Sequence, residues 1–236
     1  MTDQTTDRVR VWDLPVRVFH WALAASFAGA YLLSESDRWR HAHVMLGYTV
    51  LGLIAFRLLW GMVGTHHARF GSFAFSPLAA LRHLREAVRG RGRRYLGHNP
   101  AGSWAVWGLL LLGAATGITG YLTLNRVAGE SFEDAHEILA NAWLTLVGLH
   151  VLGVFFTSVL QRESLVRAMW TGDKPGVLGE PEARPHRLIG ISLAAAVFGF
   201  WAWSLSTPPP MAFAGAEVTR DVEHSELFED HDSDHD

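Results

Sequence analysis

The sequence predicts an all-α integral membrane protein, with a bundle of four transmembrane helices followed by a fifth transmembrane helix. The chain has 236 residues, of which 20 are Lys or Arg and 23 are Asp or Glu. None of these charges lies in residues 101–124, 138–160 or 188–207. Uncharged runs of about 20 residues are long enough to cross roughly 30 Å of hydrocarbon as helices. The sequence therefore excludes a soluble protein.

Two weaker apolar segments, residues 18–33 and 42–63, complete the set of five spans. The first could be a signal peptide, since Ala22-Leu23-Ala24 resembles a cleavage site. The apolar run continues past that site, however, so we interpret the segment as an uncleaved first span.

The distribution of basic residues predicts the orientation of the spans. Positively charged residues accumulate in the cytoplasmic loops of membrane proteins. With five spans, sixteen of the 20 Lys and Arg residues fall on the side of the N-terminus, and only Arg38, Arg40, Arg126 and Arg220 fall on the other. The sequence thus predicts a multi-pass protein of the bacterial inner membrane, with its N-terminus in the cytoplasm and its C-terminus in the periplasm.

Two segments outside the spans have distinct compositions. Between spans two and three, an apolar row alternates with basic residues at helical spacing, which predicts an amphipathic helix attracted to anionic membrane lipid. The row is Leu78, Leu81, Leu84 and Val88, and the basic residues are Arg82, Arg85 and Arg89. Residues 208–236 form an acidic tail that is too polar to fold alone, and its three histidines leave a metal-binding role as an alternative.

The cofactor chemistry is limited by the absence of cysteine. Disulfides, thiolate zinc sites, iron–sulfur clusters and covalently attached c-type haem all need cysteine sulfur. Four histidines lie within the predicted spans, where ionisable residues are costly and suggest function. They are His20, His43, His136 and His150.

Helix geometry and topology divide these four histidines into two pairs. His136 and His150 are 14 residues apart, so both point from one face of a helix, roughly 21 Å apart along its axis. His136 then lies near the outer surface, at the level of His43, and His150 lies deeper, toward the level of His20. The predicted pairs are His43 with His136 and His20 with His150.

Two imidazoles from opposite sides suit the axial positions of a haem iron, and helical bundles form such sites in their core. Zinc or copper fits less well, because neither pair has a carboxylate or sulfur ligand beside it. His41 is about 200° round the helix from His43, and only His43 shares a stripe with Gly47, Val50 and Ile54. Three loop histidines could replace the inner ligands: His66, His67 and His98.

Span three contains glycines at positions 108, 113, 117 and 120. They predict close helix packing, or room for a flat macrocycle beside the backbone. Near the inner ends of their spans, Arg17 and Arg57 are candidate partners of haem propionates.

Four motifs resemble the prokaryotic di-haem b-type cytochromes, which include the cytochrome b subunit of nickel–iron hydrogenases and the bacterial b-561-type cytochromes. The motifs occur in order: LPVRVFHWAL, AHVMLGYTVLGLIAFRLLWGMVG, RYLGHNPAGSW and DAHEILANAWLTLVGLHVL. The resemblance covers residues 9–176. It implies that a four-helix bundle holds two b haems at His20, His43, His136 and His150, and that electrons pass between a periplasmic partner and membrane quinone.

The chain departs from the hydrogenase cytochromes in its additional helix, residues 187–207, and its acidic tail. The tail could attract a basic c-type cytochrome, so the partner is either such a cytochrome or a dehydrogenase or hydrogenase subunit. We expect an electron-transfer subunit rather than a self-contained enzyme. The alternatives are a small-substrate oxidoreductase, such as a superoxide:quinone or ferric reductase, and a haem-free anchor or transporter.

Overall fold

The structure, a computed structural model, describes residues 8–73, 76–91, 93, 95–127, 131–176 and 182–207. All five predicted spans are helical, which confirms the all-α architecture. They are α1 (Leu14–Leu32), α2 (Arg40–Val63), α4 (Pro100–Leu124), α5 (Ser131–Gln161) and α7 (Arg187–Ser206). The predicted acidic tail, residues 208–236, lies outside the described residues.

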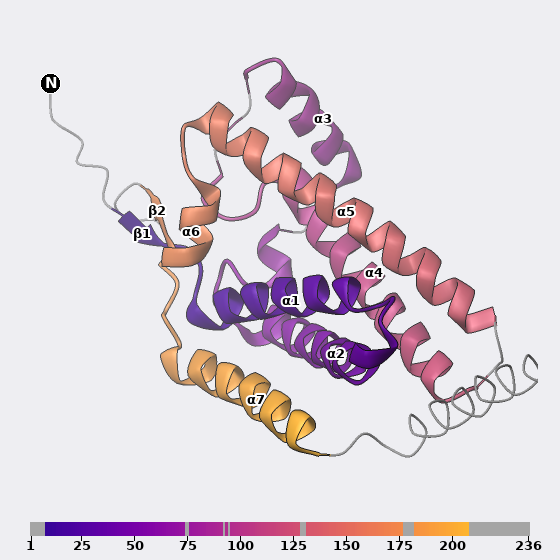
Figure 1. The fold of residues 1–236 in the computed structure, drawn as a ribbon. Helices are drawn as coiled ribbons and strands as arrows, with labels where there is room; N and C mark the ends of the chain where they lie inside the picture. Colours follow the sequence, from indigo (N-terminus) through magenta and orange to yellow (C-terminus); the bar gives the residue numbers. More distant parts are fainter. Residues whose placement is uncertain are drawn as a thin grey trace, which may run out of the picture.

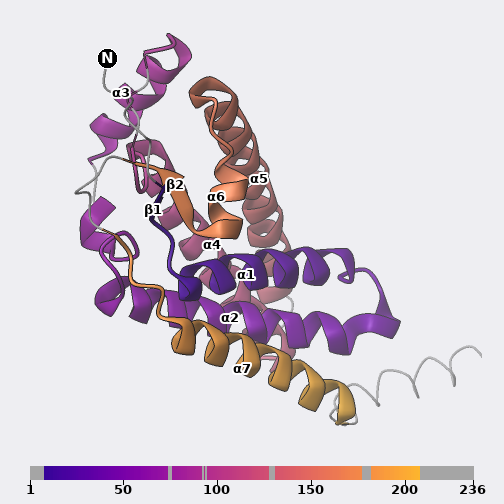
Figure 2. The same ribbon diagram turned by 90° about the vertical axis from the view of Figure 1, so that its left-hand side faces the viewer.

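Four of these helices are long and apolar enough to cross a membrane: α2 together with its preceding turn η1 (Asp37–Trp39), α4, α5 and α7. Helix α1 is long enough, with 19 residues, but is not among these four helices. It packs along both α2 and α7, and the three helices lie side by side in Figures 1 and 2.

Polar caps fix where two of the helices begin. The Asp13 carboxylate accepts a hydrogen bond from the backbone N–H of Val16 at 2.9 Å, and Asn99 accepts one from Gly102 at 2.7 Å. In both cases a proline follows within the first turn, where its missing N–H costs nothing. Helix α1 therefore starts four residues before the apolar run that predicted it.

The core lies where α1, α2, α4, α5 and α7 meet. Helix α4 packs along α5 and also contacts α2. Helices α1 and α5 meet through the rings of Phe27 and Trp143, whose centres are 4.3 Å apart, and through a 2.9 Å hydrogen bond from Tyr31 to Asn141. The buried side chains of the core are Phe19, Phe27, Val50, Leu53, Ile54, Leu110, Trp143 and Val197.

Three short elements were not predicted. Strands β1 (Arg8–Arg10) and β2 (Asp173–Pro175) pair antiparallel, with Val9 opposite Lys174, and α6 (Leu165–Thr171) precedes β2. This small sheet joins the start of α1 to the chain that leaves α5. A strand of three residues is too short to show an alternating pattern in sequence.

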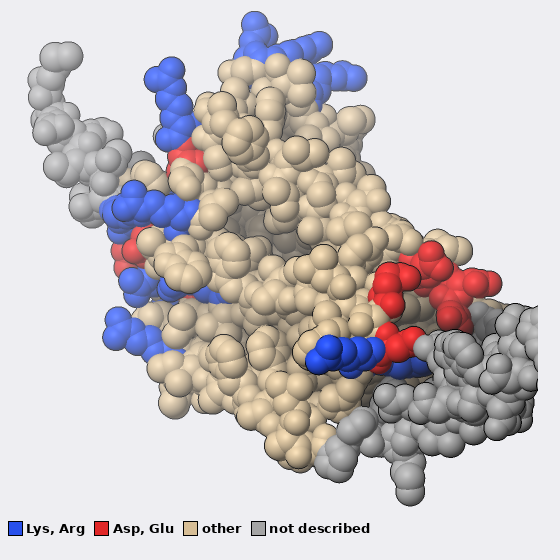
Figure 3. Space-filling view, viewed as in Figure 1, with Lys and Arg blue, Asp and Glu red and all other residues tan. Residues whose placement is uncertain are grey.

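The two ends of the helix bundle differ in charge. Figure 3 shows Lys and Arg gathered over β1, α6 and α3 (Pro77–Val88), and acidic residues over the start of α5. We call these the basic end and the acidic end. Helices α1, α4 and α7 begin at the basic end, and α2 and α5 begin at the acidic end, as the predicted alternation requires (Figure 1).

Helix α3 confirms the predicted amphipathic segment. It packs against α4 and buries Ala80 and His83, while Leu78 and Val88 remain 75% and 77% exposed. The apolar row thus faces away from the protein. Its position on the membrane surface stays a prediction.

Candidate functional site

His43 and His136 form the acidic-end pair. His43 lies in the first turn of α2 and His136 near the start of α5. Their ring centres are 6.1 Å apart, and the ring planes are inclined by 84°.

In each ring of the acidic-end pair, Nδ1 forms a hydrogen bond with a backbone carbonyl. Nδ1 of His43 lies 2.8 Å from the carbonyl oxygen of Ala30, and Nδ1 of His136 lies 2.9 Å from that of Thr116. A carbonyl can only accept, so Nδ1 carries the proton in each ring and Nε2 keeps its lone pair. A neutral imidazole that donates from Nδ1 and ligates through Nε2 is the usual metal-binding form.

Small residues surround the acidic-end pair. Gly120 on α4 faces His136, and a Cβ at position 120 would lie 2.9 Å from the ring carbon Cε1 of that histidine. A Cβ at Gly47, one turn after His43, would have no atom within 4 Å. The backbone therefore leaves open space beside His43.

His20 and His150 form the basic-end pair. They come from α1 and α5 and are close enough for their charges to interact. Within the described residues, Nδ1 of His20 is buried without a hydrogen-bond partner. Figure 3 shows that the surface between α1 and α5, beside α6, is hollowed.

Trp143 lies midway between the two pairs. It follows His136 by seven residues and precedes His150 by seven, so all three lie near one face of α5. Its side chain is 3% exposed, contacts Phe27, and fits against Gly113, where a Cβ would be 2.6 Å from the indole. In this way, α4 glycines serve close packing, as the sequence predicted.

Of the competing histidines, three lie away from the two pairs and His98 lies beside the basic-end pair. Nε2 of His41 is 2.9 Å from the carbonyl oxygen of Ser204 on α7, so this ring points away from His136. His66 and His67 follow the end of α2, with ring centres 5.1 Å apart. His98 contacts Trp12 and Phe73 and interacts electrostatically with His150, which places it beside the basic-end pair.

A buried polar cluster lies at the start of α1, at the basic end. Asp13, 1% exposed, accepts hydrogen bonds from Trp60 at 3.0 Å and from Thr65 at 2.8 Å. Arg57, 3% exposed, interacts with the charge of Asp13, and one of its terminal nitrogens has no partner in the described part of the chain. Arg17 donates to the backbone carbonyl of Trp170.

Burial perturbs two titratable groups outside the spans at this end. Burial, together with the charges of Arg57, Lys174 and His67, lowers the pKa of His98 to about 3. Burial also lowers the pKa of Lys174, although Glu163 opposes this effect. His98 is therefore neutral at physiological pH.

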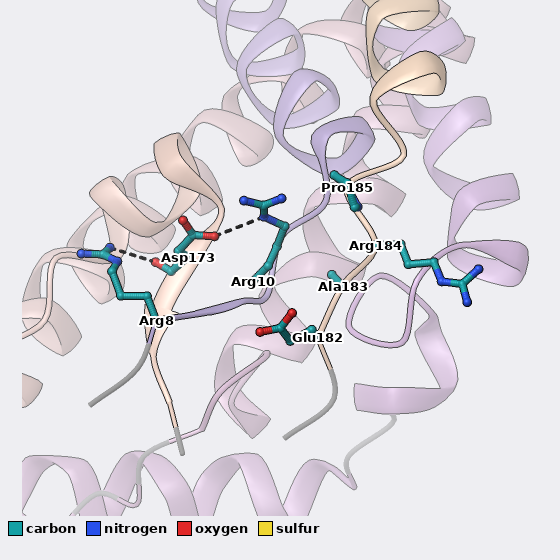
Figure 4. Close-up of a pocket in the computed structure, with 7 residues that line it drawn as sticks. All are labelled: Arg8, Arg10, Asp173, Glu182, Ala183, Arg184 and Pro185. Atoms are coloured by element: carbon teal, nitrogen blue, oxygen red, sulfur yellow. Dashed lines mark hydrogen bonds and ion pairs between the residues drawn. The ribbon is translucent and has the colours of Figure 1, made fainter. Parts of the chain in front are cut away.

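A charged cavity of about 350 Å³ lies beside the small sheet. Figure 4 shows Asp173 between the side chains of Arg8 and Arg10, and Arg10 is paired to its carboxylate at 3.2 Å. Glu182 and Arg184 complete its charged lining.

The acidic-end pair fits a bis-histidine haem iron. Imidazole–metal bonds are about 2 Å long and the ring centre lies about 1 Å beyond the nitrogen, so two imidazoles that flank one ion have centres about 6 Å apart. The observed 6.1 Å matches this value. No group of three or more His, Cys, Asp or Glu side chains able to hold a metal ion occurs in the described ranges.

Sequence reasoning missed three residues, two of them at the basic end. Asp13 and Lys174 are charged residues in segments predicted to lie outside the spans, yet both are buried. The third residue is Trp143. The sequence shows that it is seven residues from both His136 and His150, and this spacing could have predicted its place on the same face of the helix.

Comparisons with known proteins agree with these features. The sequence profile of the family described as prokaryotic cytochrome b561 matches residues 11–172. A probable Ni/Fe-hydrogenase B-type cytochrome subunit of Bradyrhizobium diazoefficiens is 22% identical over 213 residues, which is 70% of this chain and 85% of that relative. A protein of the same description from Azotobacter vinelandii is 30% identical over 142 residues, 48% of this chain and 58% of that relative. No solved structure matches.

Proposed function

Since the chain belongs to the prokaryotic cytochrome b561 family, membrane proteins that transfer electrons by haem b, we propose that it holds two b haems and relays electrons between a redox-enzyme partner and membrane quinone. The acidic-end pair would ligate one haem and the basic-end pair the other. We assign this function to the bundle of residues 9–176, of which the family profile matches 11–172, and residues 187–207 add a helix outside that match. Bound haem supplies a one-electron Fe²⁺/Fe³⁺ couple.

The geometry of the acidic-end pair carries this proposal. The carbonyl groups of Ala30 and Thr116 orient His43 and His136 before any cofactor binds, and fix the tautomer that leaves Nε2 free. Arg57 and Arg17 would face haem propionates at the basic end. One terminal nitrogen of Arg57 has no hydrogen-bond partner among the residues that the structure describes, which supports this role.

The partner is proposed from the charge of the acidic end and from the names of the relatives. Three carboxylates near His136 are exposed: Glu133, Asp134 and Glu137. They favour a positively charged periplasmic surface, either a c-type cytochrome or a subunit of a hydrogenase or dehydrogenase.

Haem content tests the proposal directly. The purified protein should contain two non-covalent haems per chain, and its reduced spectrum should show a b-type α band. Redox titration should resolve two one-electron components. A protein with fewer than two haems per chain would contradict the proposal.

The proposed orientation, with the N-terminus in the cytoplasm of a bacterial inner membrane, has its own test. Because the chain has no cysteine, single cysteines can be labelled without background. The variant Arg85→Cys on α3 should react with an impermeant maleimide only in inverted vesicles. The variant Glu133→Cys on α5 should react only in intact spheroplasts. The opposite pattern would reverse the orientation.

A further inference from the structure

The apolar row of helix α3 is exposed along its whole length. Its members and their exposed fractions are Leu78 (75%), Leu81 (58%), Leu84 (52%) and Val88 (77%). They recur every three or four residues, so they follow one side of the helix. Exposed apolar surface of this extent marks a site of interaction with a protein or a membrane.

Three arginines, which we call the basic sector, flank the apolar row. Successive residues of a helix are turned by about 100°, which places Arg82, Arg85 and Arg89 on one flank of the row. The buried Ala80 and His83 lie on the other flank. All three arginines are exposed, and Figure 3 shows positive side chains over this helix. Helix α3 therefore presents an apolar side and a positive side next to each other.

The buried side of α3 fixes the direction in which the apolar row points. The ring centre of His83 lies 5.4 Å from that of Tyr95, and the helix packs against α4. Ser76 caps the first turn by accepting a hydrogen bond from the backbone N–H of Ala79 at 3.2 Å. Because these contacts hold α3 in one rotation, the apolar row stays directed away from the bundle.

The apolar row lies at the end of the bundle where spanning helices leave the hydrocarbon. The last turns of α2 expose Leu59, Met62 and Val63, as a helix in contact with lipid does. Helix α3 begins at Pro77, only 14 residues after α2 ends at Val63. It packs against α4, which begins at the same basic end (Figure 1). Acyl chains and lipid head groups are thus within reach of α3.

We propose that α3 lies in the membrane surface and binds anionic phospholipid there, with the apolar row among the acyl chains and the basic sector on the phosphate groups. An interfacial helix of this kind buries its apolar side by about 5–10 Å. Guanidinium groups pair bidentately with phosphate oxygens, and each basic residue near an anionic surface adds to the attraction. The site is independent of the proposed haems and quinone, since it contains neither histidine pair.

The charge of α3 favours a lipid surface over a second copy of this chain. Two copies that met through their apolar rows would bring their basic sectors close together, and like charges at an interface repel. Glu86 is the one acidic residue of α3 and cannot balance the arginines. An anionic membrane supplies acyl chains and negative charge side by side, which is the arrangement that α3 presents.

A measurement of depth tests the apolar row. Because the chain has no cysteine, the neighbouring substitutions Leu81→Cys and Arg82→Cys can each carry a single nitroxide label. Both haem-loaded variants are placed in nanodiscs of phosphatidylcholine and phosphatidylglycerol. Collisions of the label with oxygen, which concentrates in hydrocarbon, are then compared with collisions with a water-soluble nickel chelate.

We expect oxygen to reach the label at position 81 several-fold more readily than the chelate does, and the reverse at position 82. If the chelate reached both labels equally, the apolar row would face water and the proposal would be wrong. If neither probe reached the label at position 81, protein would cover the row, and a second copy of the chain would replace lipid as the occupant.

A measurement of lipid preference tests the basic sector. Spin-labelled phosphatidylglycerol and phosphatidylcholine are added to the protein in phosphatidylcholine nanodiscs, and the fraction of each lipid that the protein immobilises is compared. The double variant Arg82→Gln/Arg85→Gln is matched with Arg162→Gln/Arg167→Gln, which removes the same charge from exposed positions near α6 at the same end. Haem content, which should be unchanged in both, reports that each variant is folded.

The parent should prefer phosphatidylglycerol several-fold, and this preference should weaken at high salt. Arg82→Gln/Arg85→Gln should lose most of the preference, whereas Arg162→Gln/Arg167→Gln should keep most of it. Equal losses in the two double variants would mean that the whole basic end attracts anionic lipid, and a parent without preference would mean that no such site exists. Either result would overturn the assignment to α3.

Discussion

The two histidine pairs differ in how firmly the protein holds them. At the acidic end, both rings donate Nδ1–H to backbone carbonyls. At the basic end, Nδ1 of His20 is buried without a partner among the described residues, and the charge of the buried Arg57 acts on His98, which lies beside this pair. One pair is therefore oriented by backbone carbonyls, whereas a buried positive charge lies at the end of the bundle that holds the other pair.

This difference has a consequence for redox potential. An imidazole that donates from Nδ1 is a more basic ligand, which stabilises ferric iron. A buried cation such as Arg57 instead stabilises the ferrous state, which carries one more electron than the ferric state. We therefore expect the basic-end haem to have the higher potential, so that electrons move downhill from the acidic end to the basic end.

The largest expected effect is the loss of one haem from one end. His136→Ala removes a ligand of the acidic-end pair, so one haem per chain should be lost while the higher-potential component remains. His150→Ala should remove the other component. The control is His41→Ala, two residues from His43 but bonded to α7, which should keep both haems. If His136→Ala retained two haems, the ligand assignment would be wrong.

A second prediction concerns Trp143, which lies between the pairs. Gly113→Ala would place a Cβ 2.6 Å from the indole and 2.9 Å from Ile54. Overpacking of this kind costs about 1–3 kcal/mol, so thermal unfolding in detergent should shift downward.

Gly148→Ala on α5 is the matched control, since its Cβ would have no atom within 4 Å. It should leave stability unchanged or raise it by up to about 1 kcal/mol through helix propensity. Equal destabilisation by the two substitutions would show that helix packing at Trp143 is not the cause.

The sequence predicted the spans well because charge is excluded from hydrocarbon, a constraint that acts on each segment alone. The sequence also favoured His43 over His41, because His43 shares a helix face with Gly47. The structure places His43 beside His136. It did not predict the burial of Asp13, Lys174 or His98, because these depend on loops that fold back between distant parts of the chain. His98, for example, contacts Trp12, 86 positions earlier.

The third prediction tests the stability of the basic end against pH. The pKa of His98 is about 3 in the folded protein and about 6.5 when unfolded. Between these values the unfolded state binds the additional proton, so stability is full above pH 6.5 and falls as the pH drops toward 3. The slope is at most about 1.4 kcal/mol per pH unit.

Thermal unfolding at pH 7 and pH 5 measures this effect. His98→Gln should lose less stability between these pH values than the parent does. We expect the α band of the higher-potential haem to be lost first on acidification, because His98 lies at the basic end. An identical pH dependence in variant and parent would refute the role of His98.

The smallest expected effect tests the charge that distinguishes the two pairs. Arg57→Gln removes a buried positive charge from the basic end, so the higher potential should fall while the lower one stays constant. A tenfold change in a one-electron equilibrium corresponds to about 59 mV, and we expect a shift of some tens of millivolts. Arg57→Lys retains the charge and should restore most of the potential, whereas a loss of packing alone would leave it low. If both potentials fell equally in Arg57→Gln, the charge would act on the whole bundle, and the difference between the two ends would need another cause.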